Sequence, residues 1–335
     1  MMVDNHRKHI KRSILADVLP LDTPFVVHID VSSACNFRCK FCFHSLGNIK
    51  LKELGFSPAI MDLDLFKLTV DKIKEFPSKL HRLCLIRHGE SLLNKDLPEM
   101  ISYAKKSGVA KKINISTNGS LLDPKINDTL IASGLDEMLV SIEALTNEKY
   151  REISDVEIDF ERLVGNIRHF YSNKKQCVLS VKIVDYALSE EGDEKIFHDI
   201  FDSICDKASV EFLVPCFRGV NYAKLKPHYN INIMGDDFVE VDVCPQPFFQ
   251  MHVFPNGNIS VCNADYNEKL VFGNVRHDSL NDVWNSNELN EFRLMHLNRE
   301  RKSHVYCNFC AGNVCYSSAS DILDASADNL RKYYR

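Results

Sequence analysis

Between residues 25 and 215, short β-rich runs alternate regularly with segments of helical periodicity, and few folds accommodate such an order. The pattern is typical of a parallel sheet whose strands are connected by helices. The candidate strands are Phe25–Val31, Arg82–Ile86, Lys112–Ser116, Glu137–Ile142, Val178–Val184 and Val210–Val214. Six strands are too few for a full eight-stranded barrel. We therefore predict an α/β fold with an incomplete ring of strands.

This alternation stops after Pro215, and a different pattern follows. Phe248–Phe254 and Ile259–Asn263 flank an Asn-Gly pair, which is a strong hairpin signal. One helix is predicted from about Ser279 to Leu297. The chain thus divides into an N-terminal extension (1–24), an α/β domain (25–215), a bridge (216–243) and a small hairpin-plus-helix domain (244–335).

Composition and charge exclude several classes of protein. The 335 residues are 45% hydrophobic and 26% charged, which is ordinary for a globular chain. A formal net charge of −5 without a concentrated basic face gives no reason to expect nucleic acid as a partner. Neither a signal peptide nor a long apolar run is present, so we expect no membrane association and a cytoplasmic location.

Twelve cysteines are many for a reducing compartment, where thiols serve metal binding or catalysis more often than disulfides. Eight fall into two groups, Cys35, Cys39 and Cys42, then Cys244, Cys262, Cys307, Cys310 and Cys315. The scattered ones are Cys84, Cys177, Cys205 and Cys216, which are predicted to pack as small apolar side chains. The two groups therefore mark candidate metal sites.

The first group lies directly after the first predicted strand, as Cys35-Asn-Phe-Arg-Cys39-Lys-Phe-Cys42. In barrel-like folds this end of a strand is where sites form. Three thiolates on one short loop can hold three irons of a cubane and leave the fourth iron open. A zinc site is the alternative, with His44 as its fourth ligand, but the spacing favours the cubane.

This C-x3-C-x2-C loop resembles the signature of the radical S-adenosylmethionine superfamily. The resemblance implies a partial (β/α)6 barrel with a [4Fe–4S] cluster on Cys35, Cys39 and Cys42, whose open iron binds S-adenosylmethionine. An electron, supplied by a donor such as flavodoxin or ferredoxin, then cleaves the cofactor to a 5′-deoxyadenosyl radical. The protein's own task is to position the reactants and exclude water.

Further family landmarks follow at the ends of the next strands. Arg87-His88-Gly89-Glu90-Ser91 stands where the family has Gly-Gly-Glu-Pro, with His88 and Ser91 departing from that motif. The resemblance implies cofactor-binding roles for Phe41, Gly89, Glu90, Ser116, Asn118, Ser141 and Glu143. Each position also fits a plainer role: a solvated turn for Glu90, strand-end turns for the polar residues, and the core for Phe41.

In the second group, Cys244, Cys262, Cys307 and Cys310 resemble the twitch domain, a shortened SPASM domain that carries an auxiliary [4Fe–4S] cluster. Cys315 is a spare or an alternative fourth ligand. A full SPASM domain continues with more paired cysteines, so one auxiliary cluster is expected. A structural zinc ion on four thiolates is the competing interpretation.

An auxiliary cluster suggests what the enzyme does. When hydrogen is removed from a carbon that bears a hydroxyl, loss of the hydroxyl proton leaves a reducing ketyl radical, whose electron a cluster can accept. The twitch-bearing inosamine dehydrogenase works in this manner, so we expect oxidation or epimerisation of a sugar, cyclitol or similar small molecule. For epimerisation, Cys216 or Cys315 would return a hydrogen atom, and Arg218 is a candidate for binding an anionic group or assisting proton removal.

Two alternatives belong to other functional classes. SPASM-type domains also serve enzymes that modify ribosomal peptides or proteins, although no leader-binding domain is evident before residue 25 or after Cys315. A non-catalytic iron–sulfur or zinc protein would not need Gly89-Glu90 or the polar segment 116–119. His28, His88 and Lys182 are further candidates near the substrate by position alone, with a structural role expected for each.

Overall fold

The computed structural model describes residues 13–237, 239–308, 310 and 318–335. Its centre is one curved sheet with the strand order β6-β5-β4-β3-β2-β1-β7-β8-β9. The first six strands run parallel and are β1 (Val26–Ile29), β2 (Leu80–Cys84), β3 (Ala110–Thr117), β4 (Glu137–Ile142), β5 (Val178–Val184) and β6 (Lys207–Glu211). The predicted partial barrel of six parallel strands is confirmed.

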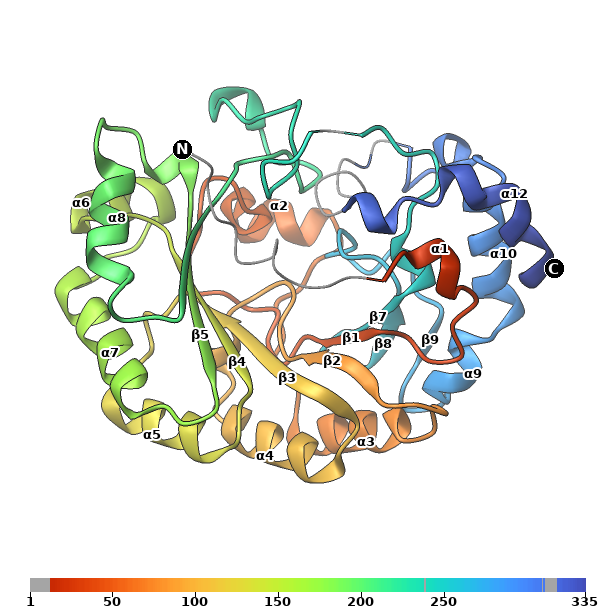
Figure 1. The fold of residues 1–335 in the computed structure, drawn as a ribbon, viewed down its shortest axis with the longest axis horizontal. Helices are drawn as coiled ribbons and strands as arrows, with labels where there is room; N and C mark the ends of the chain where they lie inside the picture. Colours follow the sequence, from red (N-terminus) through yellow and green to blue (C-terminus); the bar gives the residue numbers. More distant parts are fainter. Residues whose placement is uncertain (1–12, 238, 309, 311–317) are drawn as a thin grey trace.

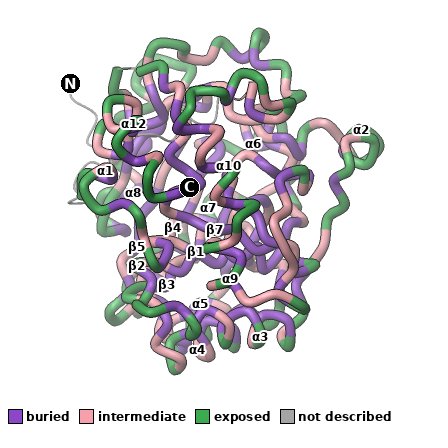
Figure 2. Tube along the Cα trace, turned by 90° about the vertical axis from the view of Figure 1, so that its right-hand side faces the viewer, coloured by how far each residue is buried: buried purple, intermediate pink, exposed green. Residues whose placement is uncertain are grey.

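Helices cover the outside of this sheet (Figure 1). They are α3 (Leu63–Ile73), α4 (Leu97–Ser107), α5 (Pro124–Ala132), α6 (Asn147–Ser154), α7 (Phe160–Asn173) and α8 (Asp193–Phe201). In α3 the side chains of Phe66, Val70 and Ile73 are buried, as their three- and four-residue spacing requires. Burial is concentrated in the strands and in the inner faces of the helices (Figure 2).

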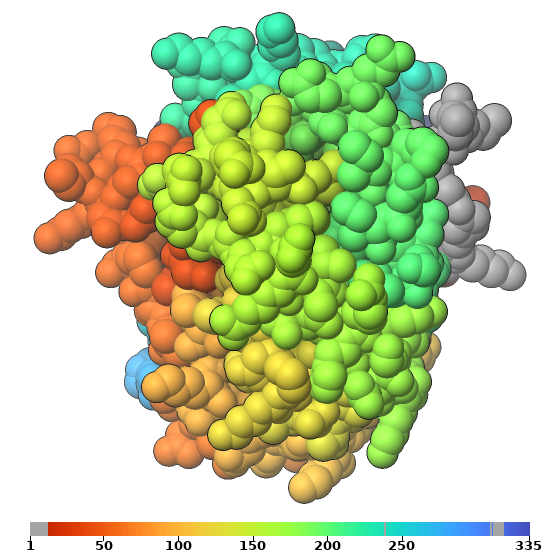
Figure 3. All heavy atoms as spheres, turned by 90° about the vertical axis from the view of Figure 1, so that its left-hand side faces the viewer, coloured from red at the N-terminus to blue at the C-terminus, as the bar shows by residue number. Residues whose placement is uncertain are grey.

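Several helix ends are set by local sequence. Asp62, Asp123 and Asp159 each accept a hydrogen bond from the backbone three residues later, so they cap α3, α5 and α7. Helix α4 ends at Gly108, whose φ of 66° is the left-handed conformation that glycine adopts readily at a C-cap. Figure 3 shows the side formed by α5 to α8, with the segment containing α2 (Gly47–Glu53) projecting beside it.

The predicted hairpin is present and extends the barrel sheet. Strand β7 (Gln250–Val253) pairs parallel with β1, and β8 (Asn258–Ser260) returns antiparallel to β7. A short β9 (Gly273–Asn274) completes the edge. The cysteine-bearing C-terminal segment is therefore attached to the same sheet that carries the first cysteine loop.

Two elements differ from the sequence-based expectation. Strand β6 ends at Glu211, because the next residues turn out of the sheet and Leu213 N donates to Asp185 Oδ1 at 2.7 Å. The single helix expected near residues 279–297 is two helices, α9 (Leu280–Trp284) and α10 (Asn287–Leu297). Ser286 interrupts them, since its hydroxyl caps α10 by accepting from Leu289 N.

The two ends of the described chain pack together. Helix α1 (Leu15–Val18) lies beside α12 (Ala327–Leu330) (Figure 1). Leu15, Leu330 and Phe248 belong to one apolar cluster. This cluster supports the segment that leads to Cys244. Among the described helices, none is both long and apolar enough to cross a membrane.

Candidate active site and cluster sites

The loop with the first three cysteines is anchored to helix α6. Cys39 Sγ lies 3.3 Å from Ser154 Oγ, and Arg38 N donates to the Ser154 carbonyl at 2.9 Å. Phe37 N points at Cys35 Sγ at 3.4 Å. These contacts hold the loop at the carboxyl end of β1, where the sequence placed it.

Burial disfavours the charged forms of these thiols. It raises the pKa of Cys35 to about 11 and of Cys42 to about 12, and it raises the pKa of Cys39 well above its usual value. Each thiolate would also be repelled by neighbouring thiolates of the same loop. Thiolates at this position therefore require a cationic partner, and three sulfur donors on one loop fit an iron–sulfur cluster.

The Gly89-Glu90 turn is packed against the cysteine loop. A Cβ at Gly89 would lie 2.3 Å from the Ser32 carbonyl oxygen, so only glycine fits. Glu90 N donates to the Ala34 carbonyl at 2.8 Å. The carboxylate of Glu90 accepts from Thr117 Oγ1, Asn118 N and Leu92 N at 2.7 to 2.9 Å. Glu90 thus braces the ends of β2 and β3 against each other.

The remaining cofactor candidates lie at the same rim. Asn118 Nδ2 donates to Asn36 Oδ1 in the cysteine loop at 2.9 Å, and Ser116 and Ser141 are half-buried in the carboxyl-terminal halves of β3 and β4. Phe41 packs edge-on against Tyr186, with ring centroids 6.2 Å apart. The structure therefore gathers all seven predicted cofactor-binding residues on the side of the barrel that carries the cysteines.

Among these candidates, Glu143 has a carboxylate oxygen that is available to bind a ligand. Its Oε2 is buried and has no hydrogen-bond partner among the residues that the structure describes. Burial raises the pKa of Glu143 to about 7, opposed by the ammonium of Lys182 and assisted by the carboxylate of Glu211. Lys182 itself pairs with Glu211. A free carboxylate oxygen here fits a hydroxyl or ammonium group of a bound molecule.

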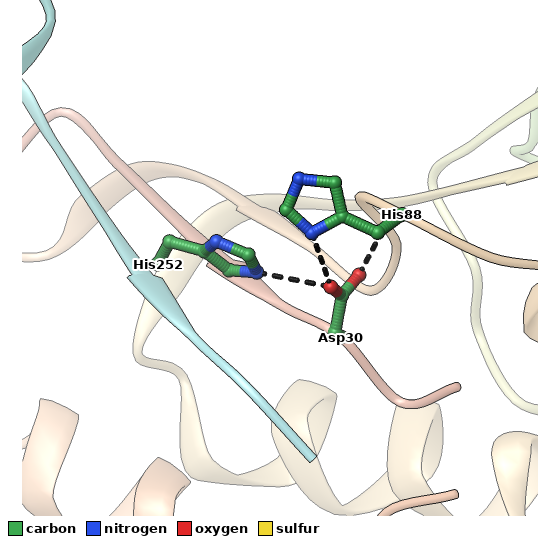
Figure 4. Close-up of side chains that lie close together, drawn as sticks. All are labelled: Asp30, His88 and His252. Atoms are coloured by element: carbon green, nitrogen blue, oxygen red, sulfur yellow. Dashed lines mark hydrogen bonds and ion pairs between the residues drawn. The ribbon is translucent and has the colours of Figure 1, made fainter. Parts of the chain in front are cut away.

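A buried cluster of Asp30, His88 and His252 was not anticipated from the sequence (Figure 4). Asp30 accepts three hydrogen bonds, from His88 N at 2.9 Å, His88 Nδ1 at 2.8 Å and His252 Nε2 at 3.1 Å. Burial opposes the charge on Asp30, but the two imidazoles outweigh it and hold the pKa of Asp30 well below its usual range. The three residues join β1, the β2 loop and β7.

Replacement of Asp30 by Asn is expected to lower the free energy of unfolding by about 3 kcal/mol at pH 7, because it removes one partner of a buried ionic network. The low folded-state pKa stabilises the protein above the unfolded-state value of about 3.9, and this contribution disappears as the pH falls below it. The difference in melting temperature between the wild type and Asp30→Asn should therefore be constant above about pH 4 and shrink progressively as the pH falls below it. The exposed Asp128→Asn is the control, and an Asp30 variant with wild-type stability would refute the network's role.

His88 also contacts the second cysteine group. Its Nε2 lies 3.2 Å from the carbonyl oxygen of Asn263, the residue after Cys262. Nε and Nη2 of Arg87 point at the same oxygen, each at 3.2 Å. The departure from the family motif at His88 thus coincides with a contact between the barrel and the C-terminal domain.

The second cysteine group surrounds a cavity of about 180 Å³. Its wall contains the thiols of Cys244, Cys262, Cys307 and Cys310, whereas Cys315 lies outside the described residues. Burial raises the pKa of Cys307 to about 12 and that of Cys244 above its usual range, and repulsion from Cys310 adds to both. Four thiols around one cavity fit an iron–sulfur cluster or another thiophilic metal centre.

Both catalytic candidates from the sequence line this second cavity. Cys216 Sγ lies 3.3 Å from the Val214 carbonyl, and the Arg218 guanidinium donates to the Tyr306 carbonyl at 3.0 Å. Tyr222, which sequence reasoning missed, donates from Oη to the Phe41 carbonyl at 2.9 Å and accepts from Phe217 N at 3.1 Å. Tyr222 therefore connects the first cysteine loop with the segment that carries Cys216.

Two weaker candidates from the sequence, His28 and His44, lie in surroundings that fit a structural role. His28 is half-buried in β1, and desolvation, followed by the charge of Arg87, lowers its pKa. His44, the alternative zinc ligand, has its Nε2 2.7 Å from the His88 carbonyl oxygen. That contact occupies one of the two nitrogens with which His44 would bind zinc.

Comparisons with known proteins agree with this arrangement. Residues 29–198 match the Radical SAM superfamily, and residues 244–328 match SPASM, an iron–sulfur cluster-binding domain. The chain is 24% identical over 287 residues to the S-adenosyl-L-methionine-dependent 2-deoxy-scyllo-inosamine dehydrogenase of Niallia circulans, covering 85% of this chain and 92% of that enzyme. It is also 32% identical over 169 residues to a probable GTP 3′,8-cyclase of Metallosphaera sedula, covering 50% and 48% of the two chains.

Solved structures show the same fold. The crystal structure of BtrN in complex with AdoMet and 2-DOIA superposes with a TM-score of 0.55 at 19% identity, over 86% of this chain and 92% of that one. Native anSMEcpe with bound AdoMet gives a TM-score of 0.57 at 13% identity, over 93% and 97%. With the Radical SAM match spanning half of the chain, the protein belongs to the radical SAM superfamily and carries a C-terminal SPASM iron–sulfur domain.

Proposed function

We propose that this radical SAM enzyme oxidises a hydroxyl-bearing small molecule, of the sugar or cyclitol class, to a ketone. The 5′-deoxyadenosyl radical takes one hydrogen atom from the carbon that bears the hydroxyl group. The hydroxyl proton then leaves, and the remaining electron passes to an auxiliary cluster, which balances a two-electron oxidation. The relative that acts on 2-deoxy-scyllo-inosamine, matched over most of both chains, supports this substrate class.

The observation that carries the proposal is the cavity bounded by Cys244, Cys262, Cys307 and Cys310. We assign these four residues to the auxiliary cluster, and Cys35, Cys39 and Cys42 to the cluster that binds the cofactor. A structural zinc ion on four thiolates is the competing assignment. Metal and sulfide content distinguish the two.

The cofactor would be held at the rim between β1 and β4. Gly89 lets the Glu90 turn approach the backbone that leads into the cysteine loop, because any larger residue would collide with it. Glu143 offers its free Oε2 there, and Ser116, Ser141, Asn118 and Phe41 supply the surrounding polar and aromatic groups. We assign Glu90 to the same site as the residue that braces these strand ends.

Iron and sulfide analysis tests the two-cluster assignment. Anaerobically reconstituted protein is expected to contain about eight irons and about eight sulfides per chain, since two cubanes are present. Zinc should be absent after reconstitution. About four irons together with one equivalent of zinc would contradict the auxiliary cluster.

A substrate panel tests the reaction. The polyol panel consists of 2-deoxy-scyllo-inosamine, myo-inositol and free hexoses, and a set of cysteine- and serine-containing peptides serves as the comparison. With reductant and S-adenosylmethionine, we expect at least one polyol to stimulate 5′-deoxyadenosine formation and to yield an equal amount of ketone. Stimulation by peptides alone would reject the proposal. A product with solvent deuterium at a carbon and no change in oxidation state would indicate epimerisation.

A further inference from the structure

Two side chains of the barrel, Arg87 and His88, converge on one carbonyl oxygen of the C-terminal domain. Arg87 Nε and Nη2 and His88 Nε2 all lie 3.2 Å from the carbonyl oxygen of Asn263. Asn263 directly follows Cys262, which lines the auxiliary cavity. Arg87 and His88 belong to the turn that also contains Gly89, so this contact connects the two halves of the active site.

His88 lies between the buried Asp30 cluster and the C-terminal domain. Its Nδ1 faces a carboxylate oxygen of Asp30 at 2.8 Å (Figure 4), and its Nε2 lies 3.2 Å from the Asn263 carbonyl oxygen. His88 thereby holds the turn beside Asn263. The Arg87 guanidinium donates to the same carbonyl oxygen and is the charged group of this contact.

Asn263 is fixed on its other side as well. Its Nδ2 donates to Gln246 Oε1 at 2.9 Å, and its Oδ1 accepts from Gln250 Nε2 at 2.7 Å. Gln246 lies two residues after Cys244 and itself lines the auxiliary cavity. The segments that carry Cys244 and Cys262 are thus tied to the same asparagine, and the Arg87 guanidinium is held beside it.

We propose that Arg87, supported by His88, tunes the auxiliary cluster and makes it easier to reduce. Reduction adds negative charge to the cluster, and a fixed cation in a weakly polar surrounding stabilises that charge. Arg87 thereby favours the transfer of the substrate electron to the auxiliary cluster. This role rests on the proposed function, in which that cluster is the electron acceptor. Arg218 and Arg301 also line the cavity. They are present in every variant, so they do not contribute to differences in midpoint potential between variants.

Two substitutions at Arg87 separate charge from packing. Arg87→Gln keeps a hydrogen-bond donor but removes the charge, whereas Arg87→Lys keeps the charge. In an anaerobic redox titration of the reconstituted holoenzyme, followed by EPR, Arg87→Gln should shift the midpoint potential of the auxiliary cluster to a more negative value. Arg87→Lys should stay close to the wild type, and so should Arg151→Gln, which removes an exposed arginine on α6.

The titration needs no substrate, so its outcome is separate from the test of the reaction. An unchanged auxiliary potential in Arg87→Gln would overturn the inference, and so would equal shifts in the Gln and Lys variants. If iron analysis instead finds no auxiliary cluster, both the proposed function and this inference fail. If the cluster is present, shifts as expected and yet no polyol is oxidised, the tuning role stands and the proposed function alone is rejected.

Discussion

Replacement of Cys39 by Ala is expected to reduce S-adenosylmethionine cleavage by more than about 100-fold, because even groups that only support a metal ligand contribute about 10- to 100-fold. Cys39 is the most deeply buried thiol of the first loop, and its surroundings disfavour a thiolate without a metal partner. Its loss should leave the first cluster without one of its three ligands. Chromatographic measurement of 5′-deoxyadenosine checks this result, and iron should fall from about eight to about four per chain.

Cys177→Ala is the matched control for this experiment. Cys177 is also buried, and burial raises its pKa to about 12, but it lies at the start of β5, away from both cysteine groups. The control should retain both clusters and cofactor cleavage. Wild-type turnover in Cys39→Ala would remove the basis for the first cluster assignment.

Replacement of Cys262 by Ala is expected to separate cofactor cleavage from substrate oxidation. The first cluster keeps its ligands, so S-adenosylmethionine cleavage should persist within a few-fold, whereas ketone formation should fall by more than about 100-fold because the electron acceptor is lost. The ratio of ketone to 5′-deoxyadenosine measures this uncoupling. We expect the ratio to fall from about one to near zero.

Cys205→Ala controls for the removal of a buried thiol elsewhere. Cys205 is 4% exposed and precedes β6, so its variant should keep the wild-type ratio. Equal loss of ketone in the two variants would indicate general destabilisation. Full ketone formation in Cys262→Ala would contradict the role of the auxiliary cluster.

Local patterns in the sequence were sufficient to predict most of the barrel. Strands β4 and β5 begin and end at the predicted residues, since their apolar runs are bounded by turns on both sides. The hairpin was predicted from its Asn-Gly turn, where Gly257 has a φ of 91°. Strand β6 was displaced by three residues, because the apolar run continues into a loop that is also buried.

Local sequence patterns could not predict contacts between residues that are far apart in the chain. Asp30, His88 and His252 meet only because β7 pairs with β1, and no local signal predicts a parallel pairing across more than 200 residues. The same pairing makes the C-terminal hairpin part of the barrel sheet, which the division of the chain at residue 244 did not anticipate. One sequence signal pointed to this cluster, because His88 stands where the family motif has glycine.

The cofactor site shows the same limit. The sequence predicted that Glu90 and Glu143 lie at the same rim of the barrel, but it could not predict how the surroundings of the two carboxylates differ. In the structure the carboxylate of Glu90 accepts from three donors in the neighbouring strand ends and its own turn. Glu143, by contrast, keeps one oxygen without a partner within the described part of the chain. Their assignment to the cofactor remains a prediction, and the free oxygen makes Glu143 the better candidate for direct contact.

A single-turnover experiment tests the central claim most directly. Enzyme with both clusters is reduced, freed of excess reductant, mixed with S-adenosylmethionine and the active member of the polyol panel, and frozen for EPR. We predict one 5′-deoxyadenosine per ketone and a signal of the reduced auxiliary cluster that requires substrate and is absent from Cys262→Ala. Cleavage of the cofactor with an oxidised auxiliary cluster and no ketone would contradict the account.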